Sequence, residues 1–376
     1  MTKLNLALQS IRTSQNKVNT IVTPVFYRIY NKEDKEAFLA LLSLPGLIVT
    51  DYILGQLKEL IKHQTPNRKF TNEELEINAF KHLGDVNMDE YGVWVHYPWS
   101  NRLVHILDEK EFIDLRTSRN QHKITTAERD LLSKKKIGVI GLSVGQSVSV
   151  TLAMERICGE LRLADFDILE LTNLNRIRSG IYNLGIKKVV TVAREIAEID
   201  PFLKVICFGD GLTEENMDAF FLEGGKLDVL IDECDGLDIK ILCRYKAKAL
   251  KIPVVMDTSD RGMIDIERFD LEPDRPILHG LIDHLDTTKL TGLSNEEKVP
   301  FILPMTGEES LSSRLKASML EVEESISTWP QLASAVTLGG GLTTDVSRRI
   351  LLNQFHDSGR YYVDLESIIS DKLTLT

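Results

Sequence analysis

The sequence predicts an α/β fold in which helices cover both faces of a mostly parallel sheet. Short apolar runs alternate with longer amphipathic segments between residues 137 and 257, which is the pattern of strands joined by helical crossovers. A glycine-containing turn directly follows the first of these runs. Of the 376 residues, 43% are hydrophobic, as in a normal globular core. We therefore expect a Rossmann-like sheet with antiparallel additions, preceded by an N-terminal α+β region.

The N-terminal region, residues 1 to 115, carries no evident nucleotide motif and is expected to form an α+β region of unknown role. Its apolar patterns predict a strand, two helices and a β segment, over residues 20–30, 35–42, 51–62 and 92–107. The last segment places Trp94, Tyr97 and Trp99 close together. These aromatic side chains could form a binding face, but we expect them to form the core of this region. Residues 116 to 376 are expected to form a second domain.

The central stretch of the chain runs from residue 134 to residue 167. Its pattern predicts a strand, a turn, a helix and a second strand, at residues 137–140, 141–145, 148–157 and 161–164. Gly159 can end the helix, and Asp165 and Asp167 follow the second strand. In a doubly wound sheet this arrangement brings backbone N–H groups at a helix N-terminus beside an acid. Such a site suits the phosphates and the ribose of a nucleotide.

The turn departs from the dinucleotide-binding pattern GxGxxG. If Gly141 is the first glycine, Ser143 and Gln146 occupy the second and third glycine positions, and Gly145 comes one residue early. The side chain of Ser143 also hinders the close backbone approach that a dinucleotide pyrophosphate makes. From this turn alone, an ordinary βαβ connection without a ligand is as good an interpretation as a nucleotide site.

Strands and helices continue to alternate after the central stretch. A helix over residues 185–199 is expected to end at Asp200-Pro201, and Thr126 can cap a short helix ahead of the first strand. Three further strands and two intervening helices are predicted, at residues 204–208, 227–232 and 252–257 and at residues 214–222 and 238–250. Residues 263–271 are expected to add an antiparallel strand.

Polar side chains collect at the carboxyl ends of these predicted strands. Asp165 ends the second strand, Asn173 and Arg176 follow in its loop, Lys188 opens the next helix, and Asp235 follows a later strand. In an open α/β sheet these ends share one crevice. Two cations can offset the charge of a triphosphate, one carboxylate can bind its magnesium ion, and another can bind the ribose hydroxyl groups. The set therefore favours ATP over NAD.

The overall charge and the cysteines narrow the class of protein. The formal net charge is −11, which disfavours a large DNA-binding surface. The four cysteines form no CxxC pair, so we expect neither a disulfide framework nor structural zinc. No apolar run approaches the roughly 18 residues of a membrane helix. The apolar patch at residues 4–8 predicts an amphipathic helix rather than a secretory signal. We expect a cytoplasmic protein without a membrane partner.

Several segments follow one another in the order and spacing of a known family. They are Arg116–Asn120 (RTSRN, similar to RYxRQ), Asp165–Asp167 (DFD, similar to DxD), Thr172–Arg176 (TNLNR, similar to the start of SNLxRQ), Gly185–Lys188 (GIKK, matching GxxK), Ile199–Pro201 (IDP, similar to INP) and Asp232–Asp235 (DECD, matching DxxD). From about Arg116 to Leu352 the chain resembles the ThiF/MoeB superfamily, the adenylating enzymes related to ubiquitin-activating enzyme. Residues 329–352 resemble the last helix of that family.

The resemblance implies a ThiF-type nucleotide-binding adenylation domain over residues 116–376, with ATP and Mg²⁺ as cofactors. The turn and the phosphate-binding side chains would be Gly141, Ser143, Gly145, Asn173, Arg176 and Lys188. Asp165 would bind the ribose, and Asp235 would bind magnesium. The catalytic residues would be Arg119, Arg176, Lys188 and Asp235.

The resemblance also implies a homodimer and a reaction. Arg119 matches the arginine that reaches into the site of the partner subunit in family homodimers. A carboxylate would attack the α-phosphate of ATP and give an acyl-adenylate and pyrophosphate. Cations are required where charge develops on the pyrophosphate, whereas a base is hardly needed because a carboxylate is ionised at neutral pH.

Other interpretations remain open from the sequence. The chain could be an adenylyltransferase for a small carboxylate, a peptide or carrier-protein C-terminus, or a modified RNA. It could also be a non-catalytic nucleotide-binding scaffold or regulatory protein or, less favoured, an NAD-dependent oxidoreductase. No cysteine follows Cys243, so the usual nucleophile for a thioester or persulfide step is missing. Asp260 and Arg261 either orient a substrate carboxylate or form an ordinary turn with an ion pair.

Overall fold

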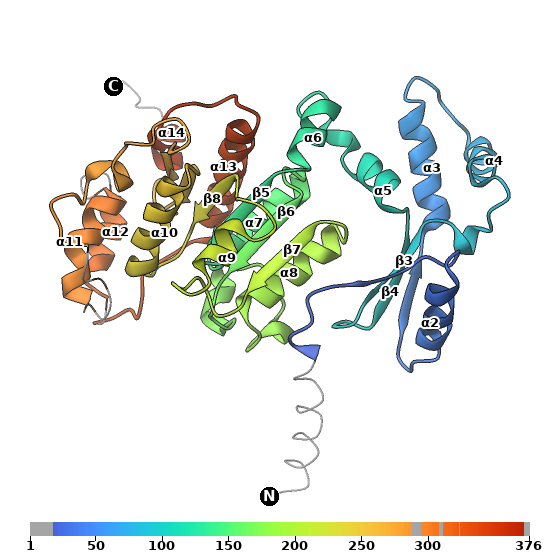
Figure 1. The fold of residues 1–376 in the computed structure, drawn as a ribbon, viewed down its shortest axis with the longest axis horizontal. Coiled ribbons are helices and arrows are strands. Elements are labelled where there is room, and N and C mark those ends of the chain that lie inside the picture. Colours follow the sequence, from blue (N-terminus) through green and yellow to red (C-terminus); the bar gives the residue numbers. More distant parts are fainter. Residues whose placement is uncertain are drawn as a thin grey trace, which may run out of the picture. The chain divides into compact units, whose positions relative to one another are not determined.

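A computed structural model describes residues 18–287, 290, 293, 295–307, 311–322 and 324–371, and Figure 1 shows the course of the chain. The chain forms two compact units. The first comprises the chain up to Thr126 together with Ala197–Phe202, and the second comprises Ala127–Ile196 and the chain from Leu203 onward. The helix expected over residues 4–8 lies outside the described residues. Among the described residues, no helix has both the length and the hydrophobicity needed to cross a membrane.

The first unit is built on a four-stranded sheet with the order β1-β3-β4-β2. Its strands are β1 (Val25–Tyr27), β2 (Ile48–Asp51), β3 (Val93–Tyr97) and β4 (Arg102–Ile106). β3 pairs antiparallel with β1 and β4, whereas β2 pairs parallel with β4. The α-helices that begin and end among the described residues of this unit are α2 (Lys32–Leu42), α3 (Ile53–Gln64), α4 (Asn72–Leu83) and α5 (Glu109–Arg116). The predicted α+β character of the N-terminal region is confirmed.

Several elements of the first unit differ from the expectation: strand β2 and helices α4 and α5 were not predicted, and one predicted strand is shorter. The strand expected over residues 20–30 is confined to β1, because Asn31 N donates to Arg28 O at 2.8 Å in a turn and the side chain of Asn31 then caps α2. Helix α4 was not predicted, because its sequence is largely polar. A capping box between Thr71 and Glu74 begins this helix, and the box satisfies backbone N–H groups that the first turn leaves free.

The aromatic side chains of β3 lie in the core of the first unit, as expected. Trp94 and Tyr97 are buried. The Trp94 ring stacks on His105 with 4.1 Å between ring centroids, and its Nε1 donates to Asp89 O at 3.0 Å. Trp99 is half-buried and donates to Glu198 Oε1 at 2.6 Å. The core interpretation therefore holds for Trp94 and Tyr97.

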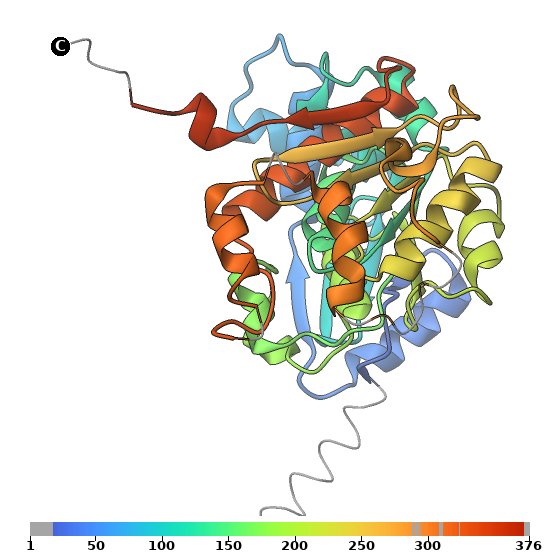
Figure 2. The ribbon, with the colours of Figure 1, turned by 90° about the vertical axis from the view of Figure 1, so that its left-hand side faces the viewer.

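The second unit contains a seven-stranded sheet with the order β11-β10-β9-β8-β5-β6-β7. Its strands are β5 (Lys136–Ile140), β6 (Glu160–Ala164), β7 (Lys204–Phe208), β8 (Val229–Asp232), β9 (Val254–Asp257), β10 (Met263–Glu267) and β11 (Gly359–Tyr362). Strands β5 to β9 are parallel, and β10 and β11, side by side in Figure 2, add antiparallel pairing. The predicted α/β class is confirmed. Because β6 and β8 flank β5, the carboxyl ends of these three strands form a topological switch point.

Helices α7 (Gly145–Glu155) and α13 (Ala333–Leu351) pack together on this sheet. Helix α8 (Lys188–Ile199) is hydrogen bonded to α7. Gln146 Nε2 of α7 donates to Glu195 Oε2 of α8 at 2.6 Å. Helices α7 and α13 approach so closely that a Cβ at Gly340 would lie 2.4 Å from Ser147 Oγ. Helix α7 does not extend to Gly159, because Arg156 adopts a left-handed φ of 55° and ends it.

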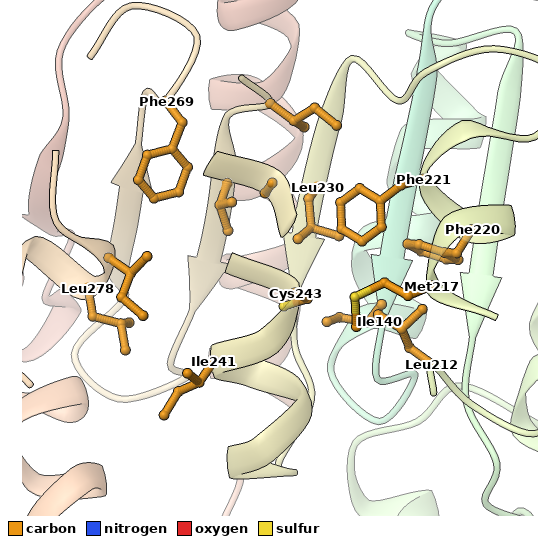
Figure 3. Close-up of a cluster of buried hydrophobic side chains, with 14 of the residues drawn as sticks. Ile140, Leu212, Met217, Phe220, Phe221, Leu230, Ile241, Cys243, Phe269 and Leu278 are labelled. Carbon is orange, nitrogen blue, oxygen red and sulfur yellow. The ribbon is translucent and has the colours of Figure 1, made fainter. Parts of the chain in front are cut away.

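The hydrophobic core of the second unit lies against α9 (Met217–Leu222) and α10 (Leu237–Ala249). Figure 3 shows Phe221 of α9 beside Leu230 of β8, with Phe220 next to Phe221, and Ile241 of α10 in the same cluster. Phe220 packs edge-on against Phe221, with 5.6 Å between ring centroids. The remaining α-helices in the described part of this unit are α6 (Thr126–Leu132), α11 (Asn295–Thr306), α12 (Ser313–Met319) and α14 (Leu365–Ile368). The packed sheet thus fixes the positions of the loops that follow β5, β6 and β8 at the switch point.

Candidate active site at the switch point of the sheet

A buried carboxylate holds the turn between β5 and α7. Asp165, which follows β6, accepts a hydrogen bond from Leu142 N at 2.6 Å through Oδ2 and from Asp167 N at 2.8 Å through Oδ1. Burial raises the pKa of Asp165, although these hydrogen bonds and the charge of Lys188 oppose the rise. Asp165 therefore joins the turn to the loop after β6.

Gly141 begins this turn under two constraints. Its φ is +80°, a conformation that side chains disfavour. In addition, a Cβ at this position would lie 2.4 Å from Glu233 O, so the backbone of the loop after β8 leaves no space for a side chain. The second constraint shows that the turn and the loop after β8 lie close together, and the first shows that the backbone at Gly141 favours glycine.

We expect Gly141→Ala to destabilise the protein more than Gly185→Ala. The φ of Gly185 is +83°, so each alanine should cost about 1–2 kcal/mol through the backbone. Gly185 has open space around it, whereas Gly141 faces backbone atoms, which adds about 1–3 kcal/mol of overpacking. Chemical denaturation of the two variants measures the difference. Equal losses of unfolding free energy would show that the turn has room for a side chain.

Two basic side chains lie around the turn. Arg176 Nε donates to Ser143 Oγ at 3.1 Å, and Lys188 Nζ donates to Asp167 Oδ2 at 2.8 Å. Burial lowers the pKa of Arg176, and the nearby charge of Asp235 opposes this effect. The structure thus places the two cations beside the turn, with Asp235 close enough to act on Arg176 electrostatically.

The remaining predicted site residues differ in their burial and in the element that carries them. Asn173 lies in the short helix Leu171–Asn175, where it is buried and its Oδ1 accepts from Glu170 N at 3.0 Å. Gly145 is the first residue of α7. Arg119 is exposed in the short helix Ser118–Asn120 of the first unit. Its role across a dimer stays a prediction. We call Asp165, Asn173, Arg176, Lys188 and Asp235 the switch-point cluster.

A cavity of about 1020 Å³ opens at the carboxyl ends of β8 and β9. Its wall includes Val144 at the start of α7, Asp235, and the whole loop from Thr258 to Gly262. Side chains of α11, α12 and α13 complete the wall. Because Val144 belongs to the turn region, a ligand in this cavity would lie next to a nucleotide held at the turn.

Magnesium binding fits Asp235 but not its neighbour Asp232. Although burial opposes ionisation, Lys240 and Arg244 lower the pKa of Asp232 to about 2, and both donate hydrogen bonds to it. Asp235 is exposed. Within the described residues, no three His, Cys, Asp or Glu side chains are arranged to hold a metal ion. Nucleotide-bound magnesium needs only one or two protein carboxylates, because phosphates and waters supply the other ligands.

Glu233 and Asp257 form a buried carboxyl pair that sequence reasoning missed. Glu233 Oε1 accepts a hydrogen bond from Asp257 N at 3.1 Å, and both residues line the cavity. Burial raises the pKa of Asp257 to about 6. Burial, together with the charge of Asp257, raises the pKa of Glu233 well above its usual value. The sequence feature that could have indicated this pair is that each acid lies at the carboxyl end of an apolar run.

Asp257→Asn should change how stability depends on pH between about 4 and 6. The usual pKa of the aspartate is 3.8, whereas folded Asp257 keeps its proton up to a pH of about 6. The folded state therefore binds more protons in this window, and the wild-type protein loses stability as the pH rises through it. The loss amounts to about 3 kcal/mol and is absent from the variant. Urea denaturation at several pH values measures it. A constant difference between the two proteins from pH 4 to 7 would contradict the assignment.

The loop after β9 forms a turn with an ion pair. Arg261 Nε donates to Asp364 Oδ2 at 2.8 Å. Asp260 accepts hydrogen bonds from Ser312 N at 3.0 Å and from Ser312 Oγ at 2.8 Å. Both side chains are thus engaged within the chain, as the interpretation of a turn with an ion pair expects.

Residues 117–299 match the model of the ThiF family. These residues, just under half of the chain, form a region of the ThiF family. The matched range contains every member of the switch-point cluster and both loops after β8 and β9. The ThiF-family match begins at residue 117, so almost all of the first unit lies outside it.

Three relatives show how far the similarity extends. The uncharacterized protein MT1398 from Mycobacterium tuberculosis (strain CDC 1551 / Oshkosh) is 45% identical over 75% of this chain and 39% of its own length. The tRNA threonylcarbamoyladenosine dehydratase of Bacillus subtilis (strain 168) is 30% identical over 41% of this chain and 60% of its length. The molybdopterin-synthase adenylyltransferase of Haemophilus influenzae is 24% identical over 41% and 62%. The chain therefore spans less than two thirds of each relative.

A solved structure is also similar in part of its fold. It is the tRNA N6-threonylcarbamoyladenosine dehydratase of E. coli in complex with ATP, with a TM-score of 0.47 and 17% sequence identity. The similarity covers 64% of this chain and 95% of that chain.

Proposed function

We propose that this chain is an ATP-dependent adenylyltransferase that activates a carboxylate as an acyl-adenylate and releases pyrophosphate. The observation that carries the proposal is the position of the switch-point cluster at the glycine turn. Arg176 touches the turn at Ser143, and Lys188 acts electrostatically on Asp165. The adjoining cavity provides space for an acceptor beside this turn. The ThiF-family match, and the similarity to a relative named an adenylyltransferase, support the same activity.

In the proposed reaction, a carboxylate oxygen of the acceptor attacks the α-phosphorus of ATP. A bond forms between that oxygen and the α-phosphorus, and the bond from the α-phosphorus to the bridging oxygen breaks. The electrons of the broken bond leave with pyrophosphate. No general base is required, because a carboxylate is ionised at neutral pH. Arg176 and Lys188 would stabilise the charge on the leaving pyrophosphate. Asp235 would hold the magnesium ion, which supplies further positive charge when bound.

We further propose that the protein acts as a homodimer with Arg119 reaching into the partner's site. Six large apolar side chains are exposed in the loops between β6 and α8: Phe166, Ile168, Leu171, Ile181, Tyr182 and Leu184. Clustered exposed apolar residues favour association. Molecular mass in solution tests the dimer. If Arg119 acts in trans, mixing the Arg119→Ala and Arg176→Ala proteins should restore part of the activity that each lacks. Failure of the mixture to gain activity would rule out a contribution in trans.

The remaining expectations about partners follow from the same site. The acceptor would be a small molecule, a peptide or a carrier-protein C-terminus, and neither DNA nor a membrane is proposed as a partner. A cytoplasmic location is proposed because all four cysteines are free, which suits a reducing compartment.

One observation favours the alternative of a non-catalytic nucleotide-binding scaffold. Asp165, Asn173 and Lys188 all make hydrogen bonds within the chain. They therefore hold the loops together in addition to any contact with a nucleotide. A scaffold would keep these contacts and ATP binding without a chemical step.

Exchange of labelled pyrophosphate into ATP distinguishes the two functions. Under the proposal, exchange requires both magnesium and a carboxylate acceptor. A panel of small carboxylates and peptides with free C-termini serves as the set of acceptors. Binding of magnesium-ATP without exchange, for every acceptor in this panel, would favour the scaffold. Tight NADH binding without affinity for ATP would favour an oxidoreductase.

A further inference from the structure

The cavity at the ends of β8 and β9 has an acidic wall. Seven of the side chains that line it are acidic and three are basic. Two of these bases already have acidic partners: Lys240 Nζ donates to Asp232 Oδ2 at 2.9 Å, and Arg261 donates to Asp364. Asp260 is engaged by Ser312. The remaining acids leave a net negative charge on the wall.

Asp257 is a buried acid of this wall with one carboxylate oxygen that lacks a hydrogen-bond partner among the described residues. Only 5% of this residue is exposed, and within the described part of the chain its Oδ1 has no hydrogen-bond partner. Its Oδ2 accepts a long hydrogen bond of 3.3 Å from Ser259 Oγ. A Cβ at Gly339 of α13 would lie 1.9 Å from Asp257 Oδ2 and 2.8 Å from its Oδ1, so α13 passes directly beside the carboxyl group. Burying a carboxylate oxygen without a partner is costly.

Glu233 adds a second carboxyl group at the same place. Its Oε1 is bound to the backbone N–H of Asp257, so the two acidic side chains are neighbours in the wall. Lys240 is near enough to affect Glu233, but its ammonium group is hydrogen bonded to Asp232. Asp232 also accepts from Arg244. The pair thus lacks a dedicated cation among the described residues.

We propose that this cavity binds a positively charged group of the acceptor, with the side chains of Asp257 and Glu233 as its ligands. The inference rests on the proposed function and narrows its substrate class to carboxylates that also carry a primary ammonium group. The ammonium group would donate to Asp257 Oδ1 and favour the ionised form of the pair, which burial otherwise opposes. The carboxylate end would lie toward Arg176 and the turn. A nucleic acid, whose backbone is anionic, fits this wall poorly.

Binding of a simple cation tests the site without any turnover. The probe is n-butylammonium, and 1-butanol is its neutral counterpart of similar size. By calorimetry or by the shift in melting temperature, the full-length protein should bind the ammonium probe about tenfold more tightly than the alcohol. Asp257→Asn and Glu233→Gln should each remove this preference. The matched control is Glu366→Gln, which removes an exposed acid of the same cavity and should change binding by less than about twofold.

Two results would overturn the inference. One is equal binding of the ammonium probe and the alcohol by the wild-type protein. The other is an unchanged preference in both Asp257→Asn and Glu233→Gln. Pyrophosphate exchange with 4-aminobutyrate and butyrate separates this inference from the proposed function. Exchange with butyrate alone would leave adenylation intact and reject the cation site. Absence of exchange with any acceptor, alongside selective binding of the ammonium probe, would reject adenylation and retain the site.

Discussion

Arg176→Ala should lower carboxylate-dependent pyrophosphate exchange by about 10²–10³-fold, as does the loss of one preorganised donor to a developing charge in other enzymes. Arg176 is half-buried beside the turn, where it contacts Ser143 and is affected by the charge of Asp235. A charge in such a setting acts more strongly than one in bulk water. The measurement is the exchange rate at saturating ATP, together with the dissociation constant for magnesium-ATP.

Arg178→Ala is the matched control for this prediction. Arg178 lies two residues away and carries the same charge, but its side chain is 67% exposed and pairs with Glu195. Its removal should leave the exchange rate nearly unchanged. Equal effects of the two substitutions would mean that Arg176 contributes only to the general charge of the surface. If Arg176→Ala weakens ATP binding but leaves the exchange rate at saturating ATP unchanged, Arg176 stabilises bound ATP and the transition state equally.

Arg244→Ala should lower the free energy of unfolding by about 3–5 kcal/mol, the usual effect of removing one partner from a buried ion pair. Arg244, Asp232 and Glu267 are all fully buried, and Arg244 Nε donates to Glu267 Oε2 at 2.7 Å. Removing the guanidinium group would leave Glu267 without this cation and Asp232 with Lys240 alone, between β8, α10 and β10. Chemical denaturation measures the loss.

The same exposed arginine provides the control for stability. Arg178→Ala breaks an ion pair at the surface and should cost about 0–1 kcal/mol. A loss for Arg244→Ala as small as that for Arg178→Ala would contradict the network described for β8, α10 and β10. Arg176→Ala therefore tests catalysis and Arg244→Ala tests stability, and Arg178→Ala is the control for both.

The regular part of the second unit could be predicted from the sequence. Each strand from β5 to β9 is an apolar run of a few residues, and such runs are typical of parallel strands buried on both faces. Boundaries were less accurate. Helix α8 begins at Lys188, three residues after the expected start at Gly185, and α13 begins at Ala333. Helix ends depend on local caps and turns, which a hydrophobic pattern does not report.

The candidate site could be predicted only in part. The order of the matched segments pointed to Arg176, Lys188 and Asp235, and the structure places all three near the turn. The pairing of Glu233 with Asp257 could not be predicted, because it depends on the register of β8 beside β9 and on the close approach of Gly339 in α13. Long-range contacts of this kind leave no periodic signal in the sequence.

A crystal structure of the full chain with magnesium and a non-hydrolysable ATP analogue tests the central claim most directly. We expect the triphosphate at the turn from Gly141 to Gly145, with Arg176 and Lys188 within hydrogen-bonding distance of phosphate oxygens and the metal ion bound to Asp235. Asp165 should contact the ribose. A triphosphate bound elsewhere, with Arg176, Lys188 and Asp235 retaining only their contacts within the chain, would contradict the account.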